Sequence, residues 1–152
     1  MELKTQIIAE KGRQDLYIHR EFDLPVHLLF LAYSEANCLE QWMGTKVLKL
    51  ECEKHGSYLF ETTDPKGGKH RFSGVFHNVK RDNIITRTFE MEDTPFPVQL
   101  EFLVFKKLTE ESSKLEIHTV FKSIEDRDKM LQLPFAKGLS LAHNRLEELL
   151  KS

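Results

Sequence analysis

The sequence predicts an α+β fold in which an antiparallel sheet curls around a C-terminal helix. Two observations lead to this class. After Gly44, short segments of alternating apolar and polar residues follow one another, separated by turn signals typical of hairpins. After Ser123, the apolar residues recur at helical spacing instead. Sequential hairpins followed by one amphipathic helix favour a sheet that buries the apolar stripe of that helix.

The first third of the chain is expected to contain one strand and two short helices. Residues 1–13 carry little periodic signal and are expected to form a strand or a loose arm. Alternating apolar residues over 14–22 predict a strand with one buried face. Asp23 or Pro25 is placed to begin a helix. A second short helix is expected to end at Gly44, a suitable C-cap residue.

Six strands are expected between the short helices and Ser123. The sequence Asp64-Pro65-Lys66-Gly67-Gly68 supplies the backbone angles of a hairpin loop. In the strand 70–79, periodicity leaves open which of the two faces is buried. After a strand over 84–89, a further clear strand is expected to hold on one face Val98, Leu100, Phe102 and Val104. The last strand is expected to face inward through Leu115, Ile117, Thr119 and Phe121.

The C-terminal segment is predicted to form one long helix that reaches Lys151. Ser123 and Asp126 resemble a capping box at its start. Pro134 should kink the helix or delay its regular start. One stripe of the helix contains Leu131, Phe135, Leu139, Ala142, Leu146 and Leu149.

Composition excludes several classes of protein. The 152 residues suit a single domain, 1–152, and the 22 basic against 24 acidic residues leave a net charge of -2, which argues against nucleic-acid binding. No apolar run approaches the roughly 20 residues that span a bilayer, and the N-terminus lacks a signal peptide, so a cytoplasmic protein without membrane contact is expected. The two cysteines are expected to be free thiols. The seven histidines lack metal-ligand spacing, so neither a metal nor a cofactor is expected.

Several stretches, taken in order, resemble the START-like (SRPBCC) superfamily. More narrowly, they are similar to proteins homologous to the C-terminal domain of the activator of the ninety-kilodalton heat-shock protein ATPase. The stretches are IHREFDLP (18–25), LLFLAY (28–33), LEQW (39–42), HGSY (55–58), RFSGVF (71–76) and Gly138-Leu139 ahead of Leu146 and Leu149. The sequence departs from the usual pattern at Leu24, Ala36, Met43 and Leu139, which stand where Ala, Pro and two Trp are usual.

The resemblance implies a helix-grip fold, in which a curved seven-stranded sheet grips the C-terminal helix and leaves an apolar cavity between them. Pro134 and Gly138 should thin the helix beside that cavity. The expected function is therefore binding of a small apolar or aromatic molecule. The residues expected to line the cavity are Trp42, Tyr58, Phe60, Phe72, Leu100, Phe102, Phe135 and Leu139.

Two other function classes stay open at this point. One is a co-chaperone-like protein that has a heat-shock ATPase as its partner. The other is an enzyme similar to polyketide cyclases or hydrolases, for which Tyr58, Arg87 and His143 are the polar candidates, although the resemblance supplies no catalytic set. Binding without catalysis is the preferred interpretation. The oligomeric state also stays open, with a homodimer among the alternatives.

Overall fold

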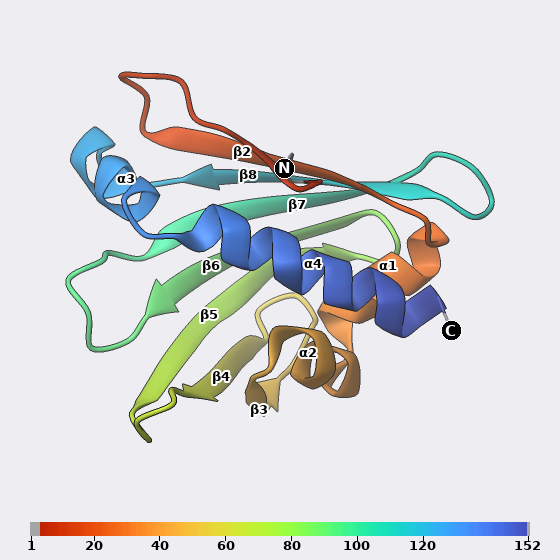
Figure 1. Ribbon diagram of the computed structural model, residues 1–152, viewed down its shortest axis with the longest axis horizontal. Coiled ribbons are helices and arrows are strands. Elements are labelled where there is room, and N and C mark those ends of the chain that lie inside the picture. Colours follow the sequence, from red (N-terminus) through yellow and green to blue (C-terminus); the bar gives the residue numbers. More distant parts are fainter. Residues whose placement is uncertain (1–3, 152) are drawn as a thin grey trace.

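The computed structural model describes residues 4–151 as one eight-stranded antiparallel sheet with four helices (Figure 1). The strands are β1 (Gln6–Ile8), β2 (Asp15–Phe22), β3 (Lys46–Leu50), β4 (Ser57–Thr63), β5 (Lys69–Lys80), β6 (Ile84–Met91), β7 (Gln99–Lys107) and β8 (Ser113–Val120). The helices are α1 (Val26–Ser34), α2 (Ala36–Met43), α3 (Ile124–Leu131) and α4 (Phe135–Lys151). Helix α4 crosses one face of the sheet, with α3 toward one end and α1 and α2 toward the other. This arrangement confirms the α+β, helix-grip prediction.

The strand order is β1-β2-β8-β7-β6-β5-β4-β3, so β2 inserts between β1 and β8. The sheet has eight strands where seven were expected, because part of the N-terminal segment pairs with β2 at the edge. Gln6 lies opposite His19, and Ile8 lies opposite Tyr17. A strand of three residues is too short to show a periodic pattern in sequence.

The two short helices form where the sequence predicts them. The backbone N–H of Leu29 donates to the carbonyl of Pro25, so α1 begins directly after this proline. Gly44 adopts φ 66°, the left-handed conformation that ends α2 as predicted. The indole Nε1 of Trp42 donates to the carbonyl of Ala32 at 2.7 Å, which fixes α2 against α1.

The prediction of one long C-terminal helix is wrong, because the segment divides into α3 and α4. The start is confirmed: the Asp126 N–H donates to the Ser123 hydroxyl at 3.1 Å. Residues 132–134 interrupt the helical backbone. Pro134 has no N–H to donate, and its ring disfavours helical backbone at the residue before it. The proline therefore separates two helices rather than kinking one.

The strand faces follow the predicted alternation with one exception. The inward residues of β2 and β8 are buried as expected. The question left open for β5 is answered by Phe76, which is fully buried, and by Val75, which is 49% exposed. The prediction for β7 is wrong: Leu103 and Phe105 are buried, whereas Leu100 and Phe102 lie on the outer face of the sheet.

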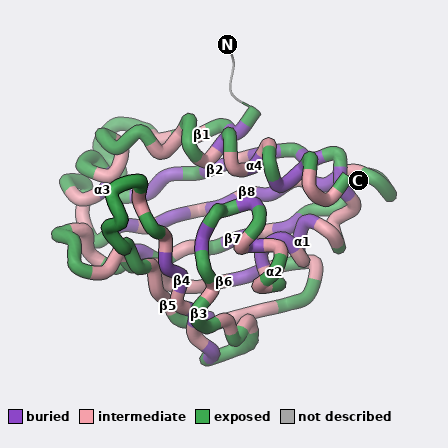
Figure 2. Tube along the Cα trace, turned by 60° about the horizontal axis from the view of Figure 1, so that its bottom comes forward, coloured by how far each residue is buried: buried purple, intermediate pink, exposed green. Residues whose placement is uncertain are grey.

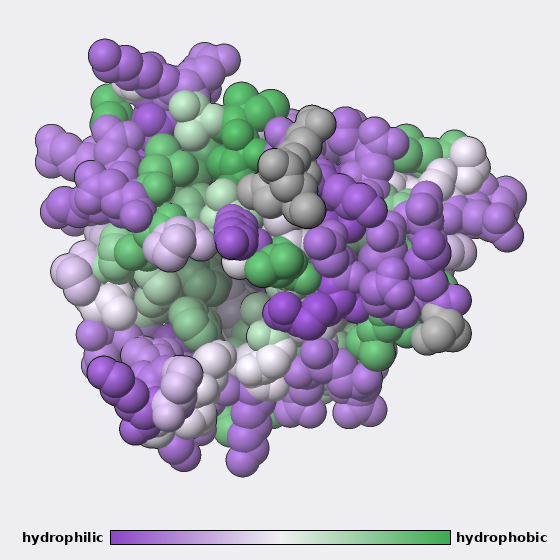
Figure 3. All heavy atoms as spheres, viewed as in Figure 1, coloured by the Kyte–Doolittle hydropathy of each residue, from purple (hydrophilic) through white to green (hydrophobic). Residues whose placement is uncertain are grey.

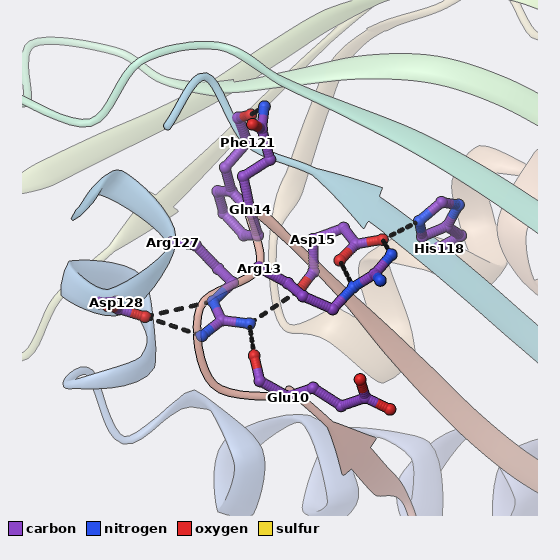
Figure 4. A network of polar contacts seen from close by, with 8 residues as sticks. All are labelled: Glu10, Arg13, Gln14, Asp15, His118, Phe121, Arg127 and Asp128. Atoms are coloured by element: carbon purple, nitrogen blue, oxygen red, sulfur yellow. Dashed lines mark hydrogen bonds and ion pairs between the residues drawn. The ribbon is translucent and has the colours of Figure 1, made fainter. Parts of the chain in front are cut away.

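Helix α3 is held in place by a buried arginine, and Figure 4 shows the contacts. The Arg127 Nη1 donates to the carbonyls of Glu10 at 2.6 Å and Asp15 at 3.1 Å. Asp15 in turn accepts from Arg13 and pairs with His118, and these hydrogen bonds, that of Arg13 first, hold the pKa of Asp15 far below its usual value. The loop before β2 thus anchors α3 to the sheet.

The buried residues gather in the strands and in α1, while α3 is largely exposed (Figure 2). Arg127 is the buried residue of α3. None of the helices formed by residues 4–151 is long and apolar enough to cross a lipid bilayer.

Candidate ligand cavity

A cavity of about 420 Å³ lies between the sheet and the segment that runs from α3 into α4. Figure 3 shows a hollow floored by hydrophobic atoms beside the first half of α4. The cavity walls come from β2, β6, β7, β8 and all four helices, with Tyr33 as the contribution of α1. The apolar lining residues are Leu16, Ile18, Leu39, Trp42, Met43, Phe89, Met91, Ile117, Phe121, Met130, Leu133, Phe135, Leu139 and Ala142.

Methionine is concentrated at this site. The chain has four methionines, and Met43, Met91 and Met130 all line the cavity. They come from α2, β6 and α3, so they approach the space from different directions. Methionine side chains are flexible and polarizable, and such residues adapt to different apolar surfaces. The wall is therefore deformable as well as apolar.

Besides Tyr33 and Thr119, the wall contains a cluster of three charged or amide side chains. Arg87 on β6 lies directly opposite Glu101 on β7, and the Arg87 Nε donates to the Glu101 Oε1 at 2.9 Å. Gln99, two residues before Glu101, donates from its Nε2 to the Glu101 Oε2 at 3.3 Å. All three residues line the cavity. Burial alone would lower the pKa of Arg87, but the attraction of Tyr58 and Glu101 raises it, so the guanidinium stays charged.

Of the residues predicted from sequence to line the cavity, Trp42, Phe135 and Leu139 do so. Tyr58 and Phe72 lie behind the wall instead. The Tyr58 ring lies 5.3 Å from the Arg87 guanidinium, and Phe72 stacks on Phe89 at 5.7 Å between ring centroids. These two aromatic residues support side chains of the wall without reaching the space themselves.

Tyr58 is held in that position by the backbone of β5 and β6. Its hydroxyl donates to the Thr88 carbonyl at 2.5 Å. The tyrosine lies opposite Gly74, where a Cβ atom would come within 2.6 Å of the Tyr58 hydroxyl. The glycine therefore makes room for the phenol, and burial raises the pKa of Tyr58.

The remaining predicted residues lie elsewhere. Phe60 is buried and packs on Tyr58 at 5.0 Å between ring centroids, but it does not line the cavity. The assignment of Leu100 and Phe102 to the cavity is wrong, because both side chains lie on the outer face, each 37% exposed. Gln99 and Glu101 take the inner positions of that strand. The inner face of β7 was predicted from its apolar residues. Because polar residues take the positions that face the cavity, this prediction chose the wrong face of the strand.

Sequence reasoning missed a buried polar network beside the cavity. His143 on α4 is fully buried, and its Nε2 and Nδ1 are hydrogen-bonded to the Tyr33 hydroxyl at 2.8 Å and the Thr5 hydroxyl at 2.9 Å. Arg20 donates from its Nη1 to Asn144 at 2.8 Å. Burial, followed by the nearby charge of Arg20, lowers the pKa of His143 to about 3, so the imidazole is neutral.

This geometry suits binding better than acid–base chemistry. His143 does not line the cavity, and both of its ring nitrogens already have partners. Arg87 and Glu101 neutralise each other at the wall. Within residues 4–151, no group of three or more His, Cys, Asp or Glu side chains is arranged to hold a metal ion.

Comparisons with known proteins agree with this fold. The sequence model of the family described as Activator of Hsp90 ATPase homolog 1-like protein matches residues 23–151. A search of the curated proteins found no match.

Solved structures with this fold come from several bacteria and a parasite. A Mycobacterium smegmatis protein is 21% identical, with a TM-score of 0.85 and 96% of each chain covered. An Arthrobacter aurescens protein is 19% identical, with a TM-score of 0.86 over 96% of this chain and 91% of that chain. An HSP90 activator from Plasmodium falciparum is 17% identical, with a TM-score of 0.57 over 71% of this chain and 73% of that chain. At these identities the likeness shows the fold alone.

Proposed function

This chain belongs to the Activator of Hsp90 ATPase homolog 1-like family, and from that premise we propose that it binds a small, mainly apolar molecule in its cavity. The observation that carries the proposal is the cavity itself, about 420 Å³ in volume and walled mainly by apolar side chains. Small-molecule sites typically measure about 300–1,000 Å³ and combine an apolar lining with a few polar groups. Arg87, Gln99 and Glu101 supply those polar groups here.

The position of the cavity supports the same proposal. Elsewhere along the sheet the core is filled by side chains such as Phe76, Ile85, Leu103 and Leu115, which have at most 1% of their surface exposed. Protein interiors are close-packed, and leaving apolar space unfilled costs stability. A bound ligand would fill this space, and this explains why large apolar residues surround the space without closing it.

A filling substitution tests the proposal. Ala142 lines the cavity, whereas its neighbour Leu141 is 48% exposed and does not. We expect Ala142→Phe to weaken binding of 2-acetylnaphthalene, measured by isothermal titration calorimetry, by about tenfold or more, because the added ring takes up ligand volume. Leu141→Phe is the matched control and should bind as the wild type does. Equal affinity in all three proteins would contradict the proposal.

A chaperone partner is the second candidate. It is favoured by the family match and by the likeness of the fold to the Plasmodium falciparum HSP90 activator. The test is a titration of the purified chain into a purified ninety-kilodalton heat-shock ATPase, with the rate of ATP hydrolysis as readout. A saturable rise in rate supports this function, and an unchanged rate excludes ATPase activation. Ala142→Phe separates the two functions, because it should affect only the cavity.

A further inference from the structure

The Arg87–Glu101 pair gives the cavity a specific kind of polar wall. Each side chain keeps only 13% of its surface accessible. The Glu101 carboxylate is held on both oxygens, one by Arg87 and the other by Gln99. Arg87 uses its Nε for this bond, and among the hydrogen bonds of residues 4–151 none starts from its two terminal nitrogens. These two nitrogens are also not among the fully buried side-chain atoms that lack a partner. The wall therefore offers hydrogen-bond donors from an arginine whose charge is already compensated.

Charge compensation decides which ligand group suits these donors. A carbonyl oxygen can accept from the terminal nitrogens of Arg87 without adding charge to the cavity. A carboxylate would accept equally well but would place a second negative charge beside Glu101, in surroundings that are mainly apolar. A pure hydrocarbon would leave the donors unpaired once water is displaced.

We infer that the cavity selects an uncharged ligand with an apolar body and one carbonyl-type acceptor, held by Arg87, and that Glu101 rejects the carboxylate of the same skeleton. This inference rests on the proposed binding function and adds the ligand class. Tyr58, whose ring lies 5.3 Å from the Arg87 guanidinium, keeps the donors in place from behind.

Three probes with one skeleton test the inference: naphthalene, 2-acetylnaphthalene and 2-naphthoate. Calorimetric titration of the wild type should rank the ketone tightest, by about tenfold or more over each of the others. Naphthalene lacks the hydrogen bond to a charged donor, and 2-naphthoate places a second negative charge beside Glu101. Equal affinity for the ketone and the carboxylate, or for the ketone and the hydrocarbon, would overturn the inference.

Glu101→Gln is the decisive variant. The amide keeps the size of the side chain and an oxygen that can accept from Arg87, but it removes the negative charge. We expect 2-naphthoate to bind this variant about tenfold or more tighter than it binds the wild type, because Arg87 then lacks a counter-charge, while the ketone changes little. An unchanged preference in a folded Glu101→Gln protein would contradict the role of Glu101.

A double variant keeps the test valid if Glu101→Gln does not fold. Arg87→Met together with Glu101→Met removes both charges at once, and replacing a buried ion pair by apolar side chains is often neutral for stability. The ketone should then bind no tighter than naphthalene, and a retained preference would overturn the role of Arg87. If none of the three probes binds the wild type, the proposed function itself fails; if naphthalene binds as tightly as the ketone, only the present inference fails.

Discussion

The two halves of α4 belong to one helix but meet the sheet in different ways. The first half, residues 135–142, is the cavity half, and it lines the open space through Phe135, Gly138, Leu139 and Ala142. The second half, residues 143–151, is the packed half, where His143 and Leu146 have no exposed surface. The stripe is continuous in sequence, so apolar pattern alone does not distinguish a filled core from a cavity wall.

The difference comes from what holds each half. In the packed half, His143 is bonded to Tyr33 and Thr5, and Glu147 accepts from the Asp23 N–H at 2.7 Å. Glu147 also lies 3.6 Å from Arg20. The cavity half follows the break at Pro134 and contains Gly138, where a Cβ atom would meet nothing within 4 Å. Firm attachment at one end lets the other end span a space without filling it.

The largest expected difference between the halves is in core truncation. Leu146→Ala should lower the free energy of unfolding by about 2–5 kcal/mol, because a fully buried leucine leaves a new cavity. Phe135→Ala should cost less, since that ring already borders the space. Only Phe135→Ala should weaken probe binding. Denaturant melts measure the loss of stability, and calorimetric titrations measure probe binding. A greater loss of stability in Phe135→Ala than in Leu146→Ala would contradict the difference between the two halves.

The packed half should also be sensitive to acid. The pKa of His143 is about 3 in the folded protein, because burial and then Arg20 disfavour its charge. The unfolded chain, with a pKa of about 6.5, binds more protons between these values, so stability falls as the pH drops through this window. We expect about 2 kcal/mol less stability at pH 5 than at pH 7.

Urea melts at the two pH values measure this loss, with His143→Gln as the control. The glutamine variant should lose much less stability between pH 7 and pH 5, because it has no imidazole to protonate on unfolding. The same slope in both proteins would mean that His143 does not set the acid response.

The smallest expected effect lies in the cavity half. Gly138→Ala should raise the free energy of unfolding by about 0.5–1 kcal/mol, because alanine is the better helix former and its Cβ meets open space. Gly44→Ala is the matched control: its backbone has φ 66°, which alanine adopts poorly, so this change should be destabilising. Chemical denaturation of the two variants measures both free energies of unfolding. A change of the same sign and size in both variants would contradict this prediction.

Much of the fold could be predicted from sequence because the physical signals are local. The alternation of apolar and polar residues predicted β2 and β8. Gly44 predicted the end of α2, and Ser123 predicted the start of the helical segment that begins with α3. For residues 1–13 a strand and a loose arm both stayed open, because the pairing of β1 with β2 is a tertiary contact of three residues. The consequence of Pro134 was underestimated, since it separates two helices.

The site was predicted less well, for a physical reason. Trp42, Phe135 and Leu139 were found because apolar residues on helices face the core in a regular way. Leu100 and Phe102 were misplaced because Gln99 and Glu101 occupy the inner positions of β7. Polar residues on the inner face of a strand break the apolar alternation on which the prediction depends. His143 was named as a polar candidate, but its buried network was missed because its partners Thr5 and Tyr33 are distant along the chain.

The most direct test of a ligand cavity under the cavity half is a titration of protein carrying ¹³C-methyl methionine, followed by NMR. Met43, Met91 and Met130 line the cavity from three different elements. With 2-acetylnaphthalene as the probe, all three methyl signals should shift together and saturate with one dissociation constant, and Ala142→Phe should suppress the shifts. If these signals stay fixed while calorimetry records binding, the probe sits elsewhere, and the cavity is not the binding site.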